Sequence, residues 1–328
     1  MNLSSAELLS SVLAETERAR AEGDRELLAA ALFQTAMLYQ QQGEAMKAIA
    51  PLQELLAVQE GAQDRQGMIA TLLCLGDLYR RQGGWHQALE LYDRARTLQE
   101  AANDRSGVAA TLGSMGVTYE GMEMWEEALN AYQHSLTIKE SLGDTRGAAL
   151  IWNNIGNIHA KRRQSEEAFD AYRKSLGIQE VAGDRPGQSI TLANLAAFHQ
   201  HRGEWIEASN RYRESLALIE EEDCQRRAAT LNGLGFVLKQ AGNLEEAMAA
   251  YQEALRLLEG AGDLLRSSVI LHNMALIREE QKEWREALRL MEQVIAIDKR
   301  IGHPDLKQDI EVFRRIRSRL DAARDTRQ

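Results

Sequence analysis

The chain has 328 residues, of which 44% are hydrophobic and 27% charged, and only three are prolines. This composition excludes an intrinsically disordered protein, and the length exceeds the roughly 250–300 residues at which one compact core stops growing. The net charge of −10 argues against general nucleic-acid binding, which needs cations to displace counterions from phosphate.

Residues 1–22 read as one amphipathic, acidic helix rather than as a targeting segment. They lack the basic start and the unbroken apolar run of a signal peptide, and no apolar stretch of 18 residues follows. The two cysteines lie 150 residues apart and suggest neither a disulfide framework nor a metal site. We therefore expect a cytoplasmic protein without membrane spans, metal or cofactor, which begins with an N-terminal capping helix.

Residues 23–303 contain seven copies of one unit. A small residue recurs in a short apolar motif such as LGDLY (75–79), in steps of 40 residues with a single step of 39. Its positions are Ala36, Gly76, Gly116, Gly156, Ala196, Gly235 and Ala275. A second small residue keeps the same step at Ala48, Ala88, Ala128, Ala168, Ala208, Ala247 and Ala287. Such a period indicates stacked repeats that share an elongated core.

Each unit reads as a pair of helices. In the first helix of the second unit, apolar and small residues follow i, i+3, i+4, i+7 spacing at Leu72, Leu75, Gly76 and Tyr79. Second helices open with a tryptophan at Trp85, Trp125, Trp205 and Trp284. The units close with Gly-Asp at 143–144, 183–184 and 262–263, where glycine suits a left-handed helix end and aspartate suits the next N-cap. Pro186 fits the first turn of the following helix.

The pattern L-x-x-L-G-x-x-Y…A-x-x-x-Y resembles the tetratricopeptide repeat over roughly residues 24–302. Its 40-residue period, and Glu100, Glu140 and Glu180 in place of the usual closing proline, are similar to a long-repeat subfamily. That subfamily contains kinesin light chains, Leu-Gly-Asn-repeat polarity adaptors and many bacterial signalling proteins. The resemblance implies an all-α fold, a right-handed α-solenoid of seven helix pairs between an N-terminal and a C-terminal capping helix.

Residues 304–328 are expected to form the C-terminal cap, because they are similar to the final helix of bacterial members. The segment 299–328 is basic, with nine Lys/Arg against five Asp/Glu. We expect four apolar residues to cover the last unit while the arginines face water. These four are Leu306, Ile310, Phe313 and Leu320.

The stretch LIWNNIGNIHA (150–160) raises the question of a binding site. On a helix at 100° per residue, Asn153, Asn154 and Asn157 lie opposite Trp152 and Ile155, and we therefore expect them outside the core. The resemblance implies that this side lines the concave groove, where carboxamides can both donate to and accept from a peptide backbone. The groove is thus expected to bind a peptide or partner protein through Asn153, Asn154, Asn157, Lys161, Asn194, Gln200, His201, Asn232, Phe236, Lys239, His272 and Asn273.

An alternative applies to Asn154, Asn194 and Asn273, which recur at one register of the repeat: they could bond one repeat to the next. Asn153 and Asn157 do not recur in every unit, which favours ligand contact. A clamp for a terminal carboxylate, known in chaperone-tail-binding members, is not supported. Ala229 and Gly233 stand where such a clamp needs Lys and Arg.

The sequence shows no pattern of an enzyme. It contains no phosphate-binding glycine loop, nucleophile elbow or metal-binding helix pair. His159 and His199 replace the tyrosine of the repeat register, so packing explains them, and the rings of His199 and His201 diverge by about 200° on a helix. We predict a non-enzymatic protein.

The leading functional hypothesis is a protein–protein interaction adaptor or scaffold. One alternative is a peptide-sensing regulatory module that acts on a separate output protein. Another is a structural scaffold that self-associates through its ends, since a basic tail faces an otherwise acidic body.

Overall fold

The computed structural model describes residues 5–260 and 262–325, and every regular element in these ranges is a helix. The prediction of an all-α protein is confirmed. The chain divides into two compact units, Met1–Arg163 and Gln164–Gln328. The division falls between the two helices that the sequence assigns to the fourth repeat. The predicted domain limits at 22/23 and 303/304 stay predictions, and residues 1–4 and 326–328 of the two caps lie outside the described residues.

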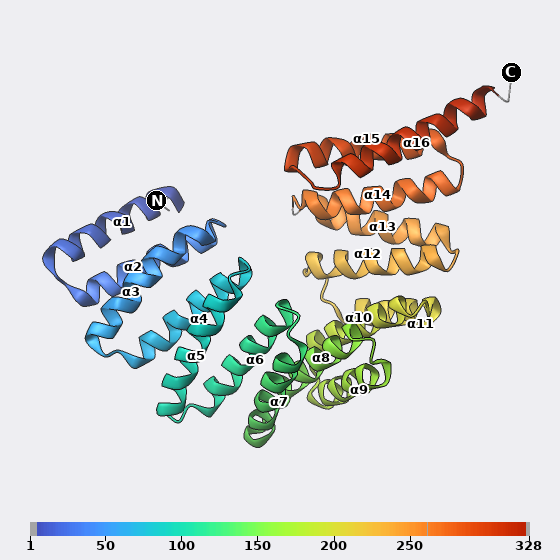
Figure 1. Ribbon diagram of the computed structural model, residues 1–328. Helices are drawn as coiled ribbons and strands as arrows, with labels where there is room; N and C mark the ends of the chain where they lie inside the picture. The colour runs from blue at the N-terminus through green and yellow to red at the C-terminus, as the bar shows by residue number, and fades with distance from the viewer. Residues whose placement is uncertain (1–4, 261, 326–328) are drawn as a thin grey trace. The chain divides into compact units, whose positions relative to one another are not determined.

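The first unit is a row of helices in which each one contacts the next (Figure 1). It contains α1 (Ser5–Glu22), α2 (Arg25–Gln41), the 3₁₀-helix η1 (Ala45–Ala48), α3 (Ile49–Ala62), α4 (Arg65–Arg81), α5 (Trp85–Ala101), α6 (Arg105–Gly121), α7 (Trp125–Leu142) and α8 (Thr145–Lys161). The pairs α2–α3, α4–α5 and α6–α7 are the hairpins predicted for the first three repeats, and α1 packs on α2 as a cap would.

The second unit continues the same alternation (Figure 1). It contains α9 (Ser165–Ala182), α10 (Arg185–His201), α11 (Trp205–Leu218), α12 (Cys224–Gln240), α13 (Leu244–Glu259), α14 (Leu264–Glu280), α15 (Trp284–Ile301) and α16 (Leu306–Asp325). The pairs α10–α11, α12–α13 and α14–α15 are the last three predicted hairpins, and α16 packs on α15.

Helix ends follow the predicted chemistry. Asp144 Oδ1 accepts the backbone N–H of Gly147 at 2.8 Å, which satisfies one of the donors at the start of α8. The same cap is made by Asp24, Asp64, Asp104, Asp184, Asp223 and Asp263. Gly143, Gly183 and Gly262 adopt φ values of 69°, 63° and 66°, the left-handed region predicted for them.

Small residues allow the two helices of a hairpin to approach closely. The second small residue is fully buried in all seven units, at Ala48, Ala88, Ala128, Ala168, Ala208, Ala247 and Ala287. A Cβ atom on Gly116 would come within 2.5 Å of the Tyr132 ring, and one on Gly235 within 2.8 Å of the Tyr251 ring. The predicted role of these positions is therefore confirmed.

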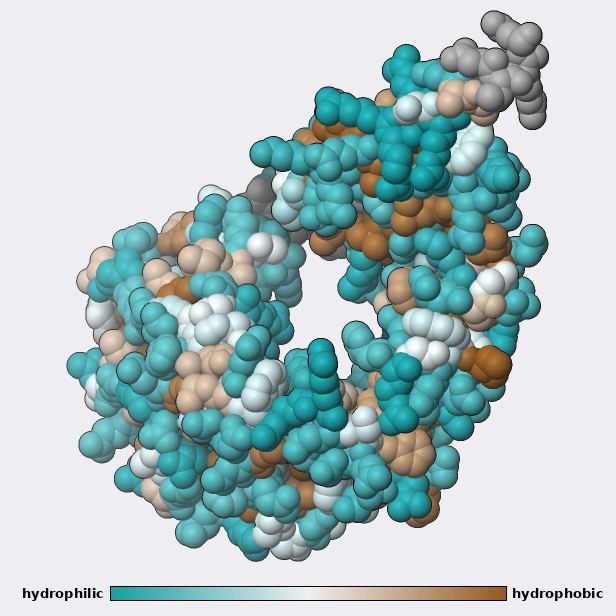
Figure 2. Space-filling model, turned by 45° about the vertical axis from the view of Figure 1, so that its right-hand side comes forward, coloured by the Kyte–Doolittle hydropathy of each residue, from teal (hydrophilic) through white to brown (hydrophobic). Residues whose placement is uncertain are grey.

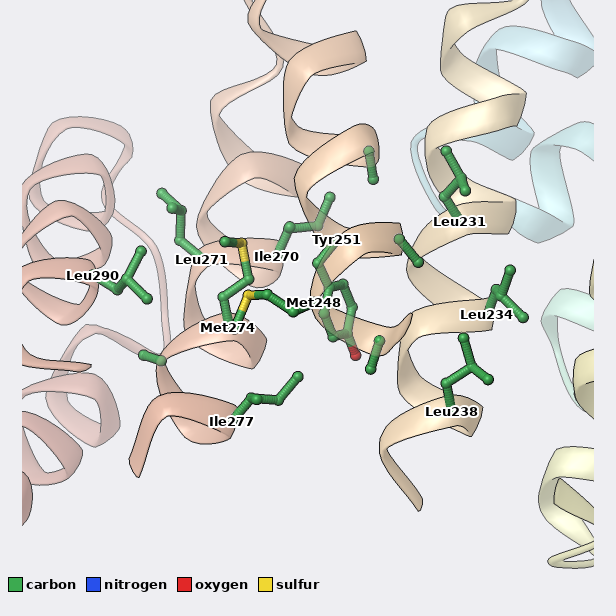
Figure 3. Close-up of a cluster of buried hydrophobic side chains, with 14 of the residues drawn as sticks. Leu231, Leu234, Leu238, Met248, Tyr251, Ile270, Leu271, Met274, Ile277 and Leu290 are labelled. Carbon is green, nitrogen blue, oxygen red and sulfur yellow. The ribbon is translucent and has the colours of Figure 1, made fainter. Parts of the chain in front are cut away.

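Apolar clusters lie between the helices of both units. In the second unit one cluster runs from α10 to α16, and Figure 3 shows its part around Tyr251 of α13. The surrounding side chains are Leu231, Leu234, Leu238, Met248, Ile270, Leu271, Met274, Ile277 and Leu290. This packing across hairpins explains why a single repeat could not bury its apolar stripe alone.

Two repeats depart from the regular pattern for local reasons. The second helix of the first repeat starts as a 3₁₀ turn, because Pro51 has no N–H for an α-helical bond to residue 47. In the 39-residue repeat, α11 ends early at Leu218 and Ile219 is extended. The irregular segment from Ile219 to Asp223 accommodates this one-residue deletion, so α12 keeps the register of the other first helices.

The prediction of how the C-terminal cap covers the last repeat is correct for Phe313, which packs against the apolar cluster of the second unit, but it misses the fully buried residues of α16. The buried residues of α16 are Asp309, Val312 and Ile316. The four predicted residues, Leu306, Ile310, Phe313 and Leu320, are only half-buried. The buried stripe thus contains an acidic residue, which hydrophobicity alone would not place in a core.

Most of the surface visible in Figure 2 is hydrophilic, and hydrophobic residues appear there as separate patches. No helix within residues 5–260 and 262–325 combines the length and hydropathy that a bilayer span requires.

Candidate partner-binding face

The first helix of each pair presents one outward side, which we call the first-helix face. It consists of the residues of α2, α4, α6, α8, α10, α12 and α14 in register with Leu150, Asn153, Asn154 and Asn157. Neighbouring first helices touch along it within each unit, since Lys161 of α8 bonds Glu120 of α6 and Asn273 of α14 bonds Asn232 of α12. All twelve sequence-predicted residues lie on or beside these helices.

The three asparagines of α8 differ in burial. Asn153 is only 3% exposed, so the expectation that it lies outside the core is wrong. Asn154 and Asn157 are half-buried. Helical periodicity predicts on which side of a helix a side chain lies, but not how much of it is exposed. Asn153 is buried although it lies on the same side of α8 as the half-buried Asn157.

Asn154 forms part of the contact between consecutive repeats. Its side chain hydrogen-bonds the hydroxyl of Tyr132, which also donates to Glu120 Oε2 at 3.3 Å. Burial first, and then the negative charge of Glu120, raises the pKa of Tyr132, so the hydroxyl remains a donor. For Asn154 this geometry favours the repeat-to-repeat role over ligand contact.

Lys161 is held at the edge of the face. Its Nζ lies 2.8 Å from Glu120 Oε1 and 5.7 Å from the centre of the Trp125 ring. The ammonium group remains largely exposed, with 53% of the side chain accessible. An ion pair of this kind contributes little to stability but fixes the position of the cation.

In the second unit, predicted residues again make internal contacts. The Gln200 carbonyl accepts the Tyr212 hydroxyl at 3.2 Å, and burial raises the pKa of that hydroxyl to about 12. Asn273 Nδ2 donates to Asn232 Oδ1 at 3.5 Å, a weak bond between consecutive first helices. Asn194 is half-buried at the same register. These amides therefore take part in contacts inside the second unit, and any contact with a partner remains a prediction.

The remaining predicted residues differ in accessibility. His201 is exposed, whereas Phe236 is half-buried against the apolar core of the second unit. Lys239 is half-buried, and desolvation lowers its pKa although Glu280 and Glu279 oppose that shift. His272 faces the C-terminal cap, with its Nδ1 atom 2.5 Å from Asp309 Oδ1.

Glu279 joins the last first helix to the cap. It is 6% exposed, and its two oxygens accept N–H groups of Arg315 at 3.0 and 2.7 Å. Arg319 Nη1 lies 2.9 Å from Glu279 Oε1. Two arginines of the basic tail therefore meet water, as predicted, with about half of each side chain exposed, and also pair with a buried carboxylate of α14.

Sequence reasoning missed an apolar position on the first-helix face. The residue three places before Asn153, Leu150, is 53% exposed, and its equivalents Ile190 and Val269 are 40% and 43% exposed. The same position is exposed and apolar in all seven first helices: Ala30, Ala70, Ala110, Leu150, Ile190, Ala229 and Val269. The signal was present in the sequence, because the 40-residue step connects these positions.

A cavity of about 440 Å³ lies between α7 and α8, on the side of α8 that carries Trp152, Ile155 and His159. The wall from α7 contains Gln133 and His134. This cavity is separate from the first-helix face, because its α8 residues lie on the opposite arc of the helix.

Comparison with known proteins gives the family. Residues 67–141, 147–221 and 226–300 match a family model described as tetratricopeptide repeat, and residues 30–58 match a second model of that description. No curated protein matches the chain.

Solved structures with this fold include three of known source. BtubC (BKLC) from P. vanneervenii is 19% identical with a TM-score of 0.52, over 80% of this chain and 94% of that one. A signal transduction ATPase (STAND protein) with a tetratricopeptide repeat sensor, from Pyrococcus horikoshii, is 18% identical with a TM-score of 0.67, over 94% and 50%. Yeast Tom70 is 12% identical with a TM-score of 0.65, over 97% and 60%. These identities show a shared fold alone. Since the family model matches more than half of the residues, the chain belongs to the tetratricopeptide repeat family.

Proposed function

We propose that this chain is a non-enzymatic interaction module that binds a peptide segment of a partner protein on its first-helix face. Tetratricopeptide repeats generally mediate protein–protein interaction. The observation that carries the proposal is the exposed apolar position repeated on every first helix, with carboxamides beside it on α8, α10, α12 and α14.

The apolar position supplies the affinity in this proposal. Leu150, Ile190 and Val269 each keep about half of their side chain exposed in the isolated chain. Since full burial of such a side chain contributes roughly 1.5–3 kcal/mol, covering the exposed part contributes about 1 kcal/mol per residue. Several such contacts in register are enough for a specific, reversible complex.

In this proposal the amides orient the bound peptide, whereas the apolar residues contribute most of the binding free energy. Asn154 and Asn273 already hydrogen-bond neighbouring repeats and Gln200 bonds Tyr212 of its own hairpin, so their conformations are ordered before a partner arrives. An ordered amide loses little entropy when it bonds a peptide backbone, which favours binding. Lys161 and His201 add charge and polarity at the rim.

The test replaces apolar face residues within the second unit by serine. Ile190→Ser combined with Val269→Ser removes two anchors, and affinity capture with quantitative mass spectrometry measures the partner proteins retained by the full chain. We expect roughly a thirtyfold loss of retained partner, since the two half-exposed side chains together contribute about 2 kcal/mol.

The chain offers a matched control on its second helices. Ile206 of α11 and Val181 of α9 are 70% and 92% exposed. Ile206→Ser combined with Val181→Ser makes the same chemical change on a different surface and should leave capture unchanged. Equal capture by both double variants, with helical content intact by circular dichroism, would remove the proposal.

The sensing alternative gains some support from the likeness to a STAND protein that carries a tetratricopeptide repeat sensor. A regulatory module would change the pitch of its solenoid when a peptide binds, whereas an adaptor would keep it. Small-angle scattering with and without a captured peptide separates the two. The self-assembly alternative loses support, because Arg315 and Arg319 of the basic tail are already paired with Glu279.

A further inference from the structure

A cluster of two carboxylates and two imidazoles lies where the C-terminal cap meets the last hairpin. Asp298 comes from the last turn of α15, His303 from the turn that follows, Asp309 from α16 and His272 from α14. Asp298 and Asp309 are 1% and 5% exposed. Potential ligand atoms of Asp298, His303 and Asp309 all lie within 4.8 Å of one another. Three segments of the chain therefore converge on one buried point.

One carboxylate oxygen of the cluster lacks a hydrogen-bond donor among the described residues. Asp298 Oδ1 accepts the hydroxyl of Ser268 at 2.5 Å, but Asp298 Oδ2 is buried and has no hydrogen-bond partner among the described residues. No lysine or arginine within residues 5–260 and 262–325 forms an ion pair with either carboxylate, and the Nδ1 atom of His272 pairs with Asp309. A buried carboxylate oxygen without a donor is costly, and two carboxylates at this separation repel each other.

Both carboxylates and the His303 ring lie around the same buried point, so a cation bound there would offset the mutual repulsion of the carboxylates.

We propose that Asp298, His303 and Asp309 bind a divalent transition-metal ion, of which zinc fits the donor set best. Imidazole nitrogen with carboxylate oxygen suits zinc, whereas magnesium and calcium prefer six or more oxygen ligands. Three protein ligands leave the fourth tetrahedral position to water. The double positive charge of the ion balances the two carboxylates and gives Asp298 Oδ2 its missing partner.

The geometry permits such a site after small side-chain movements. Ligand atoms bound to tetrahedral zinc are about 3.4 Å apart, so separations of at most 4.8 Å must contract by no more than about 1.4 Å. Ser268 and His272 hold one oxygen of each aspartate, which orients both carboxylates toward the shared point. They act as positioning residues in the outer shell of the metal.

Binding would tie the cap to the last repeat. Two ligands precede α16 and one belongs to it, so the ion closes a short loop between α15 and α16. The folded cap binds the ion and the unfolded cap does not, and mass action then stabilises α16 against local opening. The consequence is a C-terminal cap whose order depends on metal.

The experiment uses the full chain after treatment with a chelator and dialysis. Zinc is titrated at neutral pH by calorimetry, and cobalt replaces zinc in a parallel titration that follows the visible absorption of tetrahedral cobalt. We expect one zinc per chain, a raised Tm and a tetrahedral cobalt spectrum. Asp298→Asn and Asp309→Asn should each weaken binding about a hundredfold, and His272→Gln about tenfold.

Matched variants keep the test decisive. His201→Gln and Asp321→Asn change an exposed histidine and an exposed aspartate of the same unit and should leave zinc affinity unchanged. The asparagine variants preserve side-chain shape, and circular dichroism verifies their folding. If the two carboxyls share only a proton, no zinc binds at one equivalent, which overturns the proposal. Equal zinc binding by wild type and the Asp298→Asn/Asp309→Asn double variant overturns it as well.

Discussion

Tyr132 in the first unit and Tyr251 in the second occupy the same register of α7 and α13, yet their hydroxyl groups have opposite surroundings. Both side chains are completely buried, and burial raises both pKa values, so both hydroxyls stay protonated. The Tyr132 hydroxyl donates to Glu120 and lies beside the Asn154 amide. The Tyr251 hydroxyl has no hydrogen-bond partner in the described part of the chain.

The cause lies in two neighbouring positions. In the second unit the register of Glu120 is occupied by Lys239, and the equivalent of Asn154, Asn273, is bonded to Asn232 instead. One repeat after Lys239, the same register is occupied by Glu279, which accepts a hydrogen bond from Arg315 of α16. The repeat therefore determines which positions come into contact, whereas the polar residues at those positions, and their hydrogen bonds, differ from one pair of helices to the next.

The largest expected effect comes from replacing Glu279, and it is best compared with the replacement of Glu120, which occupies the same register of the repeat. Glu279→Ala should lower the free energy of unfolding of the C-terminal cap by about 2 kcal/mol, because it removes a buried carboxylate that accepts from two half-exposed arginines of α16. Glu120→Ala should cost about 1 kcal/mol, since it removes one partly exposed ion pair and one hydrogen bond. Hydrogen exchange resolved by helix measures α16 in the first variant and α8 in the second. An unchanged exchange rate in α16 would contradict the comparison.

Removing the tyrosine hydroxyls should change stability in different directions. Tyr132→Phe should destabilise the first unit by about 1 kcal/mol, because Asn154 and Glu120 lose a partner. Tyr251→Phe should be neutral or stabilising by up to about 1 kcal/mol, since it removes a buried hydroxyl that has no bond. Urea unfolding of both variants checks the sign, and equal losses at the two sites would show that the joints are alike.

A smaller effect is expected at the aspartates that cap α8 and α14. Asp144→Ala should cost about 1 kcal/mol at neutral pH. A hydrogen bond from Lys139, followed by one from the Gly147 amide, lowers the pKa of Asp144. Its contribution is therefore complete above the unfolded pKa of aspartate and is lost as pH falls through the lower folded value.

The control for this cap is Asp263→Ala at the start of α14, where the carboxylate accepts the Arg266 backbone amide and pairs with the Arg266 guanidinium at 3.4 Å, a longer contact than the 2.8 Å between Lys139 and Asp144. Thermal unfolding between pH 2 and 7 compares each variant with wild type. A difference for Asp144→Ala that does not shrink toward acid pH would contradict the assigned charge state.

The smallest effect is expected at the rim. Lys161→Met should change the free energy of unfolding by no more than about 0.5 kcal/mol, because the pair with Glu120 is largely exposed on the lysine side. Addition of salt should reduce even this difference. A loss above about 1 kcal/mol in chemical denaturation would mean that the pair holds α6 and α8 together.

The sequence was sufficient for the hairpins and their ends, because those signals are local. The tryptophans that open second helices, the aspartate caps and the left-handed glycines each act within a few residues, and the structure places them as expected. The repeat period then sets which helices pair, without any information on distant contacts.

Depth and long-range pairing could not be predicted in the same way. Asn153 and Asn157 lie on the same side of α8, yet only the first is buried. Asp309 lies on the buried stripe of α16 because His272, 37 residues earlier, faces it. No period in the sequence reports such pairs, since each depends on side chains from different helices, and the Asp298–His303–Asp309 cluster was missed for that reason.

The irregular segment from Ile219 to Asp223 has a practical consequence for protein engineering. This segment accommodates a deletion of one residue without changing the register of α12. It is therefore a position at which hairpins from related proteins can be joined. Chimaeras spliced there should retain the order of the first helices, and with it the surface on which a new recognition sequence could be selected.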